Sequence, residues 1–273
     1  MDQLPRIRER IDSIWGLQDL VGALRAMAGV HLREAQEAFA GTRAYVKTVE
    51  RAISAVAPLT RMPATRGDGP SLLLAICSEH GFVGGFNKEI LQEVKKHRAP
   101  DEELQLVGQR GANRASETGL AAKTVHPMTS RVGGIAGLAR RISAGLAGAS
   151  TVRIVFATYR AGAGFEPTIR PILPLNPGQF VDETPRQPPL HHLAPDALME
   201  SLASEFLFAE IANALMESLA SENGARLRAM EAASRNIGDR LEKLRSEQRV
   251  IRQADITSDL LDVVTGAEAA AEE

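Results

Sequence analysis

One stretch of this chain has residue types and a spacing that chemistry could use. It is the sequence SEHGFVGGFN, from Ser78 to Asn87, which follows an expected strand and opens an expected helix, where nucleotide-binding loops are found. It lacks the Gly-Lys-Ser/Thr ending of a phosphate-binding Walker loop, and Gly81, Gly84 and Gly85 do not follow the GxGxxG spacing. We therefore favour a tight strand-to-helix turn. The alternative is a small-molecule enzyme that binds a nucleotide at this loop.

The histidines and the single cysteine provide no second candidate. His191 and His192 are neighbours in a proline-rich linker, an arrangement that rarely binds one metal ion without further ligands. His31 lies within an expected helix, and the only cysteine, Cys77, suits buried packing better than chemistry. Nothing resembles a nucleophile elbow or an HExxH motif. We expect no catalytic residue, no metal and no cofactor, and hence a protein that is not an enzyme.

The element that begins the chain is predicted to be one long helix. Between Pro5 and Pro58 there is no proline, and apolar or small residues recur every seven positions, as in a helix that contacts a partner along its length. This row is Ile7, Ile14, Val21, Ala28, Ala35, Thr42, Val49 and Val56. A second, less regular row is Ile11, Leu17, Leu24, Leu32, Phe39, Val46 and Ile53.

A second proline-free stretch follows Pro195, with Asp196 placed to cap a helix and Gly266 placed near its end. Residues 206–220 are apolar on most sides, which predicts burial against several neighbours, whereas the apolar positions after Arg226 form one narrow stripe. We expect the two terminal helices to pair as an antiparallel coiled coil. The nonapeptide ALMESLASE occurs twice, but a 17-residue offset within one helix places the copies on different faces, so we reject a repeat protein.

The middle of the chain alternates between strand and helix patterns, as in a Rossmann-like α/β domain. The expected strands are residues 72–77, 104–109, 151–159 and 168–175, and the expected helices are residues 87–97 and 134–147. Pro171 and Pro174 predict that the last strand lies at a sheet edge. The expected parts are an N-terminal coiled-coil helix at 1–60, the α/β domain at 71–190 and a C-terminal coiled-coil helix at 196–268, with a linker from Pro185 to Pro195.

The bulk composition narrows the class of partners. The 273 residues are 44% apolar, and the net charge of −2 gives no general reason to expect nucleic acid or anionic lipid as a partner. No apolar run approaches the roughly 20 residues of a membrane span, and the first residues lack a signal-peptide pattern. We therefore expect a protein that is neither inserted in a membrane nor secreted.

Two features of the C-terminal helix predict protein partners. Its residues 235–252 carry six cations against three acids, a basic collar that could face acidic loops of a partner. The collar consists of Arg235, Arg240, Lys243, Arg245, Arg249 and Arg252. The helix is also longer than the first one by about 20 residues at 1.5 Å per residue, which leaves an apolar tip without an intrachain partner. The tip consists of Ile256, Leu260, Leu261, Val263 and Val264.

Several segments resemble the gamma subunits of F-type ATP synthases. They are RIRERIDSI and ALRAMAGVHLREAQ in the first helix, the central SEHGFVGGFN, and then SLASENGARLRAMEAASRN and RQADITSDLLDVVTGA in the last helix. The resemblance covers both ends of the chain and the first strand and turn of the middle domain, in the same order.

The resemblance implies a non-catalytic central stalk. Its coiled coil would turn inside a hexamer of alternating alpha and beta subunits, with the α/β domain at the foot beside the epsilon subunit and the membrane c-ring, at the cytoplasmic face of a bacterial inner membrane. Rotation would couple ion flow to ATP synthesis or hydrolysis, because changing contacts bias each beta subunit among its nucleotide states. Arg252 and Gln253 match the pair that engages a beta-subunit loop.

This sequence also departs from that family. The stretch ALRAMAGVHLREA has few lysines, residues 112–149 match poorly, and three acids follow Gly266, so the predicted buried tip is confined to about Ile256 through Val264. These departures leave two alternatives open. One is the gamma-like subunit of a sodium-pumping bacterial rotary ATPase, and the other is a non-rotary coiled-coil scaffold.

Overall fold

A computed structural model describes residues 3–60, 69–160, 164–175 and 190–271. The chain divides into two compact units. The larger unit is Ala28–Leu227, and the smaller unit combines Met1–Met27 with Arg228–Glu273. Two long helices, α1 (Gln3–Val56) and α5 (Pro195–Ala271), contribute to both units. The expected terminal helices are therefore present.

The larger unit contains a five-stranded sheet with the order β3-β2-β1-β4-β5. The strands are β1 (Ser71–Ile76), β2 (Glu103–Val107), β3 (Thr124–His126), β4 (Thr151–Arg160) and β5 (Gly164–Leu173). Neighbouring strands among the first four are parallel, and β5 is antiparallel to β4. The remaining helices are α2 (Phe86–His97), α3 (Gln109–Glu117) and α4 (Ile135–Leu146), with short 3₁₀ turns η1 (Ala57–Leu59) and η2 (Val132–Gly134).

The four expected strands and two expected middle helices are present with shifted ends. The last strand lies at a sheet edge, as its prolines predicted. Two elements were not predicted, α3 and β3, because α3 is a short polar segment and β3 has only three residues. Residues 185–189 of the expected linker lie outside the described residues.

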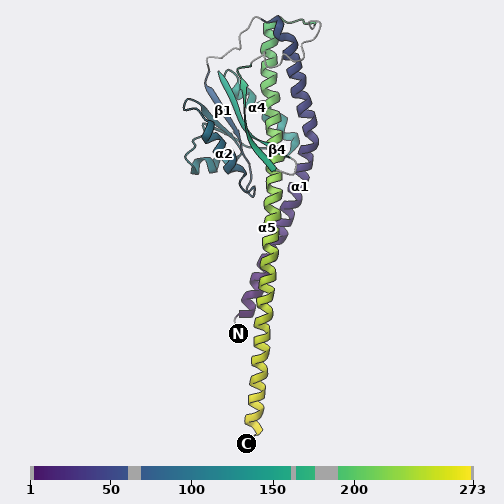
Figure 1. Ribbon diagram of the computed structural model, residues 1–273, viewed down its shortest axis with the longest axis vertical. Coiled ribbons are helices and arrows are strands. Elements are labelled where there is room, and N and C mark those ends of the chain that lie inside the picture. The colour runs from purple at the N-terminus through teal and green to yellow at the C-terminus, as the bar shows by residue number, and fades with distance from the viewer. Residues whose placement is uncertain (1–2, 61–68, 161–163, 176–189, 272–273) are drawn as a thin grey trace. The chain divides into compact units, whose positions relative to one another are not determined.

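Side chains of successive strand residues separate into two cores, since a strand alternates its faces. Leu72, Leu74 and Ile76 pack in the core formed with α1, α4 and α5. Leu73 and Ala75 pack in the opposite core, formed with α2 and α3. Figure 1 shows the sheet of the larger unit between α2 and the two long helices.

Helices α1 and α5 pack in antiparallel directions. In the larger unit, Arg43 pairs with Glu217, whereas Tyr45, two residues further along α1, donates a hydrogen bond to Glu205, twelve residues earlier in α5. The buried apolar α1 residues of this unit are Ala28, Ala35, Val46, Val49, Ile53 and Val56. All of them belong to the two predicted rows.

The smaller unit has its own short seam. Ile7 and Ile11 of α1 pack with Leu241 and Leu244 of α5 in one apolar cluster. Leu17 was assigned to the second row but is 52% exposed, so this assignment is wrong. Helix geometry explains this exposure. Leu17 is six residues from Ile11, and at 3.6 residues per turn this spacing turns its side chain away from the seam.

The predicted start of α5 needs correction, whereas Gly266 lies near its end as expected. The helix begins at Pro195, whose lack of an N–H costs nothing at the first helical position, so Asp196 lies in the first turn and is not the cap. Its charge still interacts favourably with the helix dipole there. At the other end the helix continues past Gly266 to Ala271.

The predicted change of character along α5 is confirmed. Residues 206–225 are buried almost throughout, whereas from Arg226 onward only isolated positions are buried. The two copies of the nonapeptide share a helix but not an environment. Ala214–Glu222 is buried, whereas Ala197–Glu205 is largely exposed.

The buried thiol of Cys77 packs against helix α3. Burial raises the pKa of Cys77 to about 12, with a smaller contribution from the Glu222 carboxylate, so the thiol stays protonated at neutral pH. A Cβ atom added at Gly111 of α3 would lie 2.0 Å from the Cβ of Cys77. This close approach explains the glycine.

We expect Gly111→Ala to destabilise the chain by about 2 kcal/mol, because the added methyl group forces α3 away from Cys77. The control is Gly137→Ala in α4, where the added Cβ would meet only a guanidinium nitrogen at 3.9 Å, and which should raise stability by about 0.5–1 kcal/mol. Urea denaturation followed by circular dichroism measures both. Equal effects of the two substitutions would contradict this packing.

Candidate functional site

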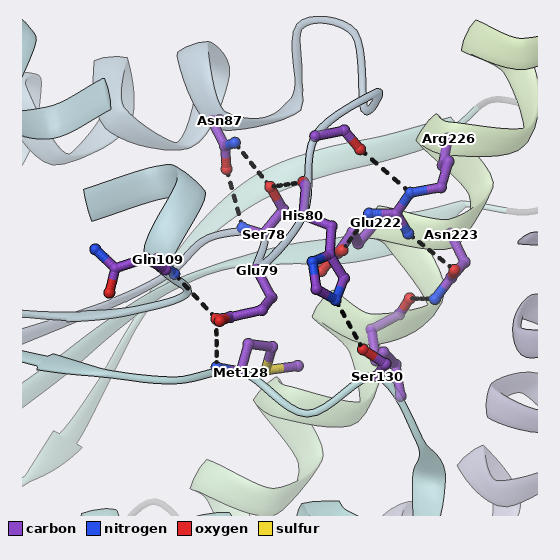
Figure 2. A network of polar contacts seen from close by, with 12 residues as sticks. Ser78, Glu79, His80, Asn87, Gln109, Met128, Ser130, Glu222, Asn223 and Arg226 are labelled. Atoms are coloured by element: carbon purple, nitrogen blue, oxygen red, sulfur yellow. Dashed lines mark hydrogen bonds and ion pairs between the residues drawn. The ribbon is translucent and has the colours of Figure 1, made fainter. Parts of the chain in front are cut away.

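The loop after β1 is closed by its own side chains. The backbone N–H of Ser78 donates to Asn87 Oδ1 at 2.9 Å, and Asn87 Nδ2 donates to Ser78 Oγ at 2.8 Å. Ser78 Oγ in turn donates to the carbonyl oxygen of His80 at 2.9 Å (Figure 2). Phe82 and Gly84 have left-handed backbone angles, with φ of 62° and 58°. The stretch from Ser78 to Asn87 is thus a tight strand-to-helix turn, as favoured from the sequence.

Glu79 joins this loop to two neighbouring connections. One of its carboxylate oxygens accepts from the backbone N–H of Gln109 at 3.0 Å and from that of Met128 at 2.8 Å. Gln109 is the first residue of α3, where a carboxylate satisfies free N–H groups. Since these segments follow β1, β2 and β3, Glu79 ties together the carboxyl ends of three parallel strands.

Two serines of α5 bind the backbone of β4. The N–H of Ala157 donates to Ser218 Oγ at 3.2 Å, and Ser221 Oγ donates to the carbonyl oxygen of Ala157 at 3.0 Å. Ala157 faces Pro167 of β5, which has no N–H, and the pairing of β4 with β1 ends at Val155. The serine hydroxyls thus bond the N–H and C=O of Ala157 beyond the point where β1 pairs with β4, in keeping with the need of buried backbone groups for partners.

One turn further along α5, Arg226 extends the contact to the loop after β1. Its Nε donates to the carbonyl oxygen of Gly81 at 3.3 Å, Nη2 to Glu222 Oε1 at 2.5 Å, and Nη1 to Asn223 Oδ1 at 3.0 Å (Figure 2). Burial raises the pKa of Glu222 above its ordinary value. The charge of Arg226 opposes this rise, and the Glu79 carboxylate adds to it. Glu222 is thus a buried acid that depends on one cation.

Together these residues place α5 at the topological switch point of the sheet. Open α/β sheets bind ligands outside the carboxyl ends of the strands where the strand order reverses, here between β1 and β4. Ser218, Ser221 and Arg226 hold α5 at this position, and Ala225 joins the core on the α2 side of the sheet. The crevice that a nucleotide would need is occupied by the chain's own helix, which argues against the nucleotide-binding alternative.

We call Ser218, Ser221, Glu222, Asn223 and Arg226 the helix clamp. None of these residues was predicted to have a role, although all lie in the segment SLASENGARLRAM that carried the family resemblance. One signal was available in the sequence. Buried helices rarely carry a serine pair, a carboxylate and an amide within six residues unless each group has a partner.

The predicted collar lies in the smaller unit, and all six of its cations are exposed. The guanidinium of Arg245 lies over the ring of Trp15, 5.2 Å from its centroid. Arg240 and Lys243 line a groove with Glu9 and Arg10 of α1. Among the described residues, no carboxylate lies within 4.0 Å of a collar cation, so these charges are available to a partner.

The predicted tip and the pair before it are also exposed. Arg252 and Gln253 are exposed, and the exposed fractions are 52% for Ile256, 61% for Leu260 and 51% for Val264. Leu261 and Val263 are similarly exposed. The seam of the smaller unit ends near Ile251, which is partly buried against it. The structure therefore gathers the predicted contact residues on one exposed length of α5.

Comparison with known proteins identifies the family. The sequence model of the family described as ATP synthase matches residues 3–270. The chain belongs to this family. The match includes both long helices and the whole sheet. Among the described residues, no helix is both long enough and apolar enough to cross a membrane.

Individual ATP synthase relatives are similar over the full length. The ATP synthase gamma chain of Fuscovulum blasticum is 29% identical over 290 residues, covering 98% of this chain and 100% of that one. The gamma chain of Geotalea daltonii is 26% identical over 283 residues, covering 98% and 99%.

Solved ATP synthase structures share the fold. The rotor of the Euglena gracilis mitochondrial ATP synthase gives a TM-score of 0.66 at 15% identity, covering 93% of this chain and 98% of that one. The central stalk and c-ring structure from Tetrahymena thermophila gives 0.58 at 22% identity, covering 79% and 99%.

The buried pair of the clamp generates a prediction. Arg226→Met should cost about 3 kcal/mol of unfolding free energy at neutral pH, because it leaves the Glu222 carboxylate buried without its cation. Burial already holds the pKa of Glu222 above 4.5, so folding favours the protonated acid. The contribution of that proton is present below pH 4.5 and is lost as the pH rises through the raised pKa.

The variant should therefore recover part of its lost stability as the pH falls. A double variant, Glu222→Gln with Arg226→Met, removes both charges and should be more stable than Arg226→Met alone at neutral pH, and this advantage should shrink as the pH falls and Glu222 of the single variant becomes protonated. Urea denaturation at a series of pH values measures all three chains. A double variant no more stable than the single one would contradict a buried charge as the cause.

Proposed function

We propose that this chain is the gamma subunit of a rotary ATP synthase, a non-catalytic shaft that couples ion flow through a membrane ring to ATP synthesis or hydrolysis in an alpha/beta hexamer. The full-length match to the ATP synthase family supports this proposal, together with gamma chains as full-length relatives. In it, residues 1–60 and 196–268 form the shaft and residues 71–190 form the α/β foot domain.

The exposed length of α5 would carry the contacts with the hexamer. The collar, Arg235, Arg240, Lys243, Arg245 and Arg249, would face acidic segments of beta subunits, and Arg252 with Gln253 would engage a beta-subunit loop. Exposed ion pairs contribute only about 0–1 kcal/mol each, so several cations are needed to bias a subunit between states. The tip residues Ile256, Leu260, Leu261 and Val264 would enter an apolar socket.

The foot domain would meet the epsilon subunit and the c-ring, which places the protein peripherally at the cytoplasmic face of a bacterial inner membrane. This role is compatible with coupling to protons and with coupling to sodium ions, because the membrane ring and not this chain would bind the ion. A non-rotary scaffold has less support, since family members with this full-length similarity are named ATP synthase gamma chains. Identification of the subunits in a native pull-down separates these proposals.

Truncation tests the role of the exposed length of α5. A chain ending at Ile251 lacks the Arg252–Gln253 pair and the tip, so the ratio of ATP-driven ion transport to ATP hydrolysis should fall in the assembled complex. The control ends at Ala267 and removes only residues 268–273, three acids and three alanines, which should leave the ratio unchanged. Transport and hydrolysis are measured on the same reconstituted vesicles.

Equal ratios for the two truncated chains and the full chain would overturn the role of these contacts. A chain that fails to assemble with alpha and beta subunits at full length would overturn the proposed function itself.

A further inference from the structure

A shaft can transmit torque to its foot only if the two cannot turn or slide against each other. In the larger unit, α5 lies against the sheet with a mainly apolar face. Apolar contacts are not directional, whereas a hydrogen bond weakens steeply with small changes of distance and angle. The directional contacts of α5 are therefore the ones that would resist its rotation against the sheet.

The helix clamp supplies such contacts on one face of α5. Ser218, Ser221, Glu222 and Arg226 follow the spacing of positions that share a helix face, and Arg226 lies about 12 Å along the axis from Ser218 at 1.5 Å per residue. The clamp engages two separate parts of the α/β domain, the backbone of Ala157 in β4 and the carbonyl group of Gly81 in the loop after β1.

The geometry makes this joint sensitive to rotation. The Cα atoms of a helix lie about 2.3 Å from its axis, so a turn of about 40° moves each Cα by roughly 1.6 Å and a side-chain oxygen further. The serine hydroxyls lie 3.2 Å and 3.0 Å from their partners on Ala157, so such a turn would break both hydrogen bonds. Both hydroxyls bond β4 beyond the point where its pairing with β1 ends, so β1 supplies no substitute for them.

We propose that Ser218 and Ser221 are positioning residues that fix the rotation of α5 against strand β4, so that the shaft and the α/β domain turn as one body. We call this contact the key. Arg226 is the second point of the key, at the loop after β1. The inference rests on the proposed function, since a key of this kind matters only in a chain that carries torque. It adds to that function the contact through which torque passes from helix to foot.

The test compares two alanine variants of the full chain in the assembled, reconstituted complex. The double variant Ser218→Ala with Ser221→Ala removes both hydroxyls. The control, Ser201→Ala, removes a hydroxyl of the same helix that bonds only to its own backbone, at the carbonyl oxygen of Ala197. The double variant should keep ATP hydrolysis but lose ion transport per ATP hydrolysed, most clearly against an opposing ion gradient. The control should keep both.

A second measurement separates a key from a merely stabilising contact. Amide hydrogen exchange at Ala157 should accelerate about fivefold or more in the double variant, the factor expected for loss of one net hydrogen bond. The conservative variants Ser218→Thr and Ser221→Thr keep the hydroxyl and should restore coupling. If the double variant does not assemble, the single variants Ser218→Ala and Ser221→Ala carry the same test.

The outcomes distinguish the key from the proposed function. Faster exchange at Ala157 with unchanged transport per ATP would overturn the key while leaving the rotary shaft in place. Equal losses in the double variant and in Ser201→Ala would also overturn it. Failure of the native chain to assemble with alpha and beta subunits would instead remove the proposed function.

Discussion

The burial of α5 residues 206–225 against the sheet is the constraint on which the rest of the structure depends. A polar atom that such a helix brings into the core costs about 1–3 kcal/mol when it has no partner. Ser218, Ser221, Glu222 and Arg226 avoid this cost with partners in β4, in the loop after β1 and in one another. The same contacts place α5 at the carboxyl ends of the strands, where related folds hold a ligand.

The periodic spacing of apolar residues predicted the long helices and the seam of the larger unit, because a heptad row marks the helix face that is covered. It also predicted the four longest strands and the edge position of β5. It missed α3, whose residues are mostly polar and whose closest approach to the sheet depends on Gly111 lying against Cys77. A glycine that fits beneath a distant side chain leaves no periodic signal.

The collar and tip of the candidate site could be predicted from the sequence, whereas the helix clamp could not. The exposure of the collar and tip follows from composition and helix length, which the sequence contains. The clamp depends on where the pairing of β1 with β4 ends, at Val155, because the two serines bond Ala157 two residues beyond that point. The two copies of ALMESLASE make the same point, since the second copy is buried throughout whereas five of the nine residues of the first are exposed.

The exposed tip has a consequence for the chain before it meets any partner. Several large apolar side chains on one accessible helix favour self-association, so unassembled chains at high concentration should be prone to aggregate. Asp255 and Asp259 are exposed among these side chains, and like charges there oppose close approach of two copies. The solubility of the free subunit thus depends on a few acids, and synthesis in step with its binding partners would keep its concentration low.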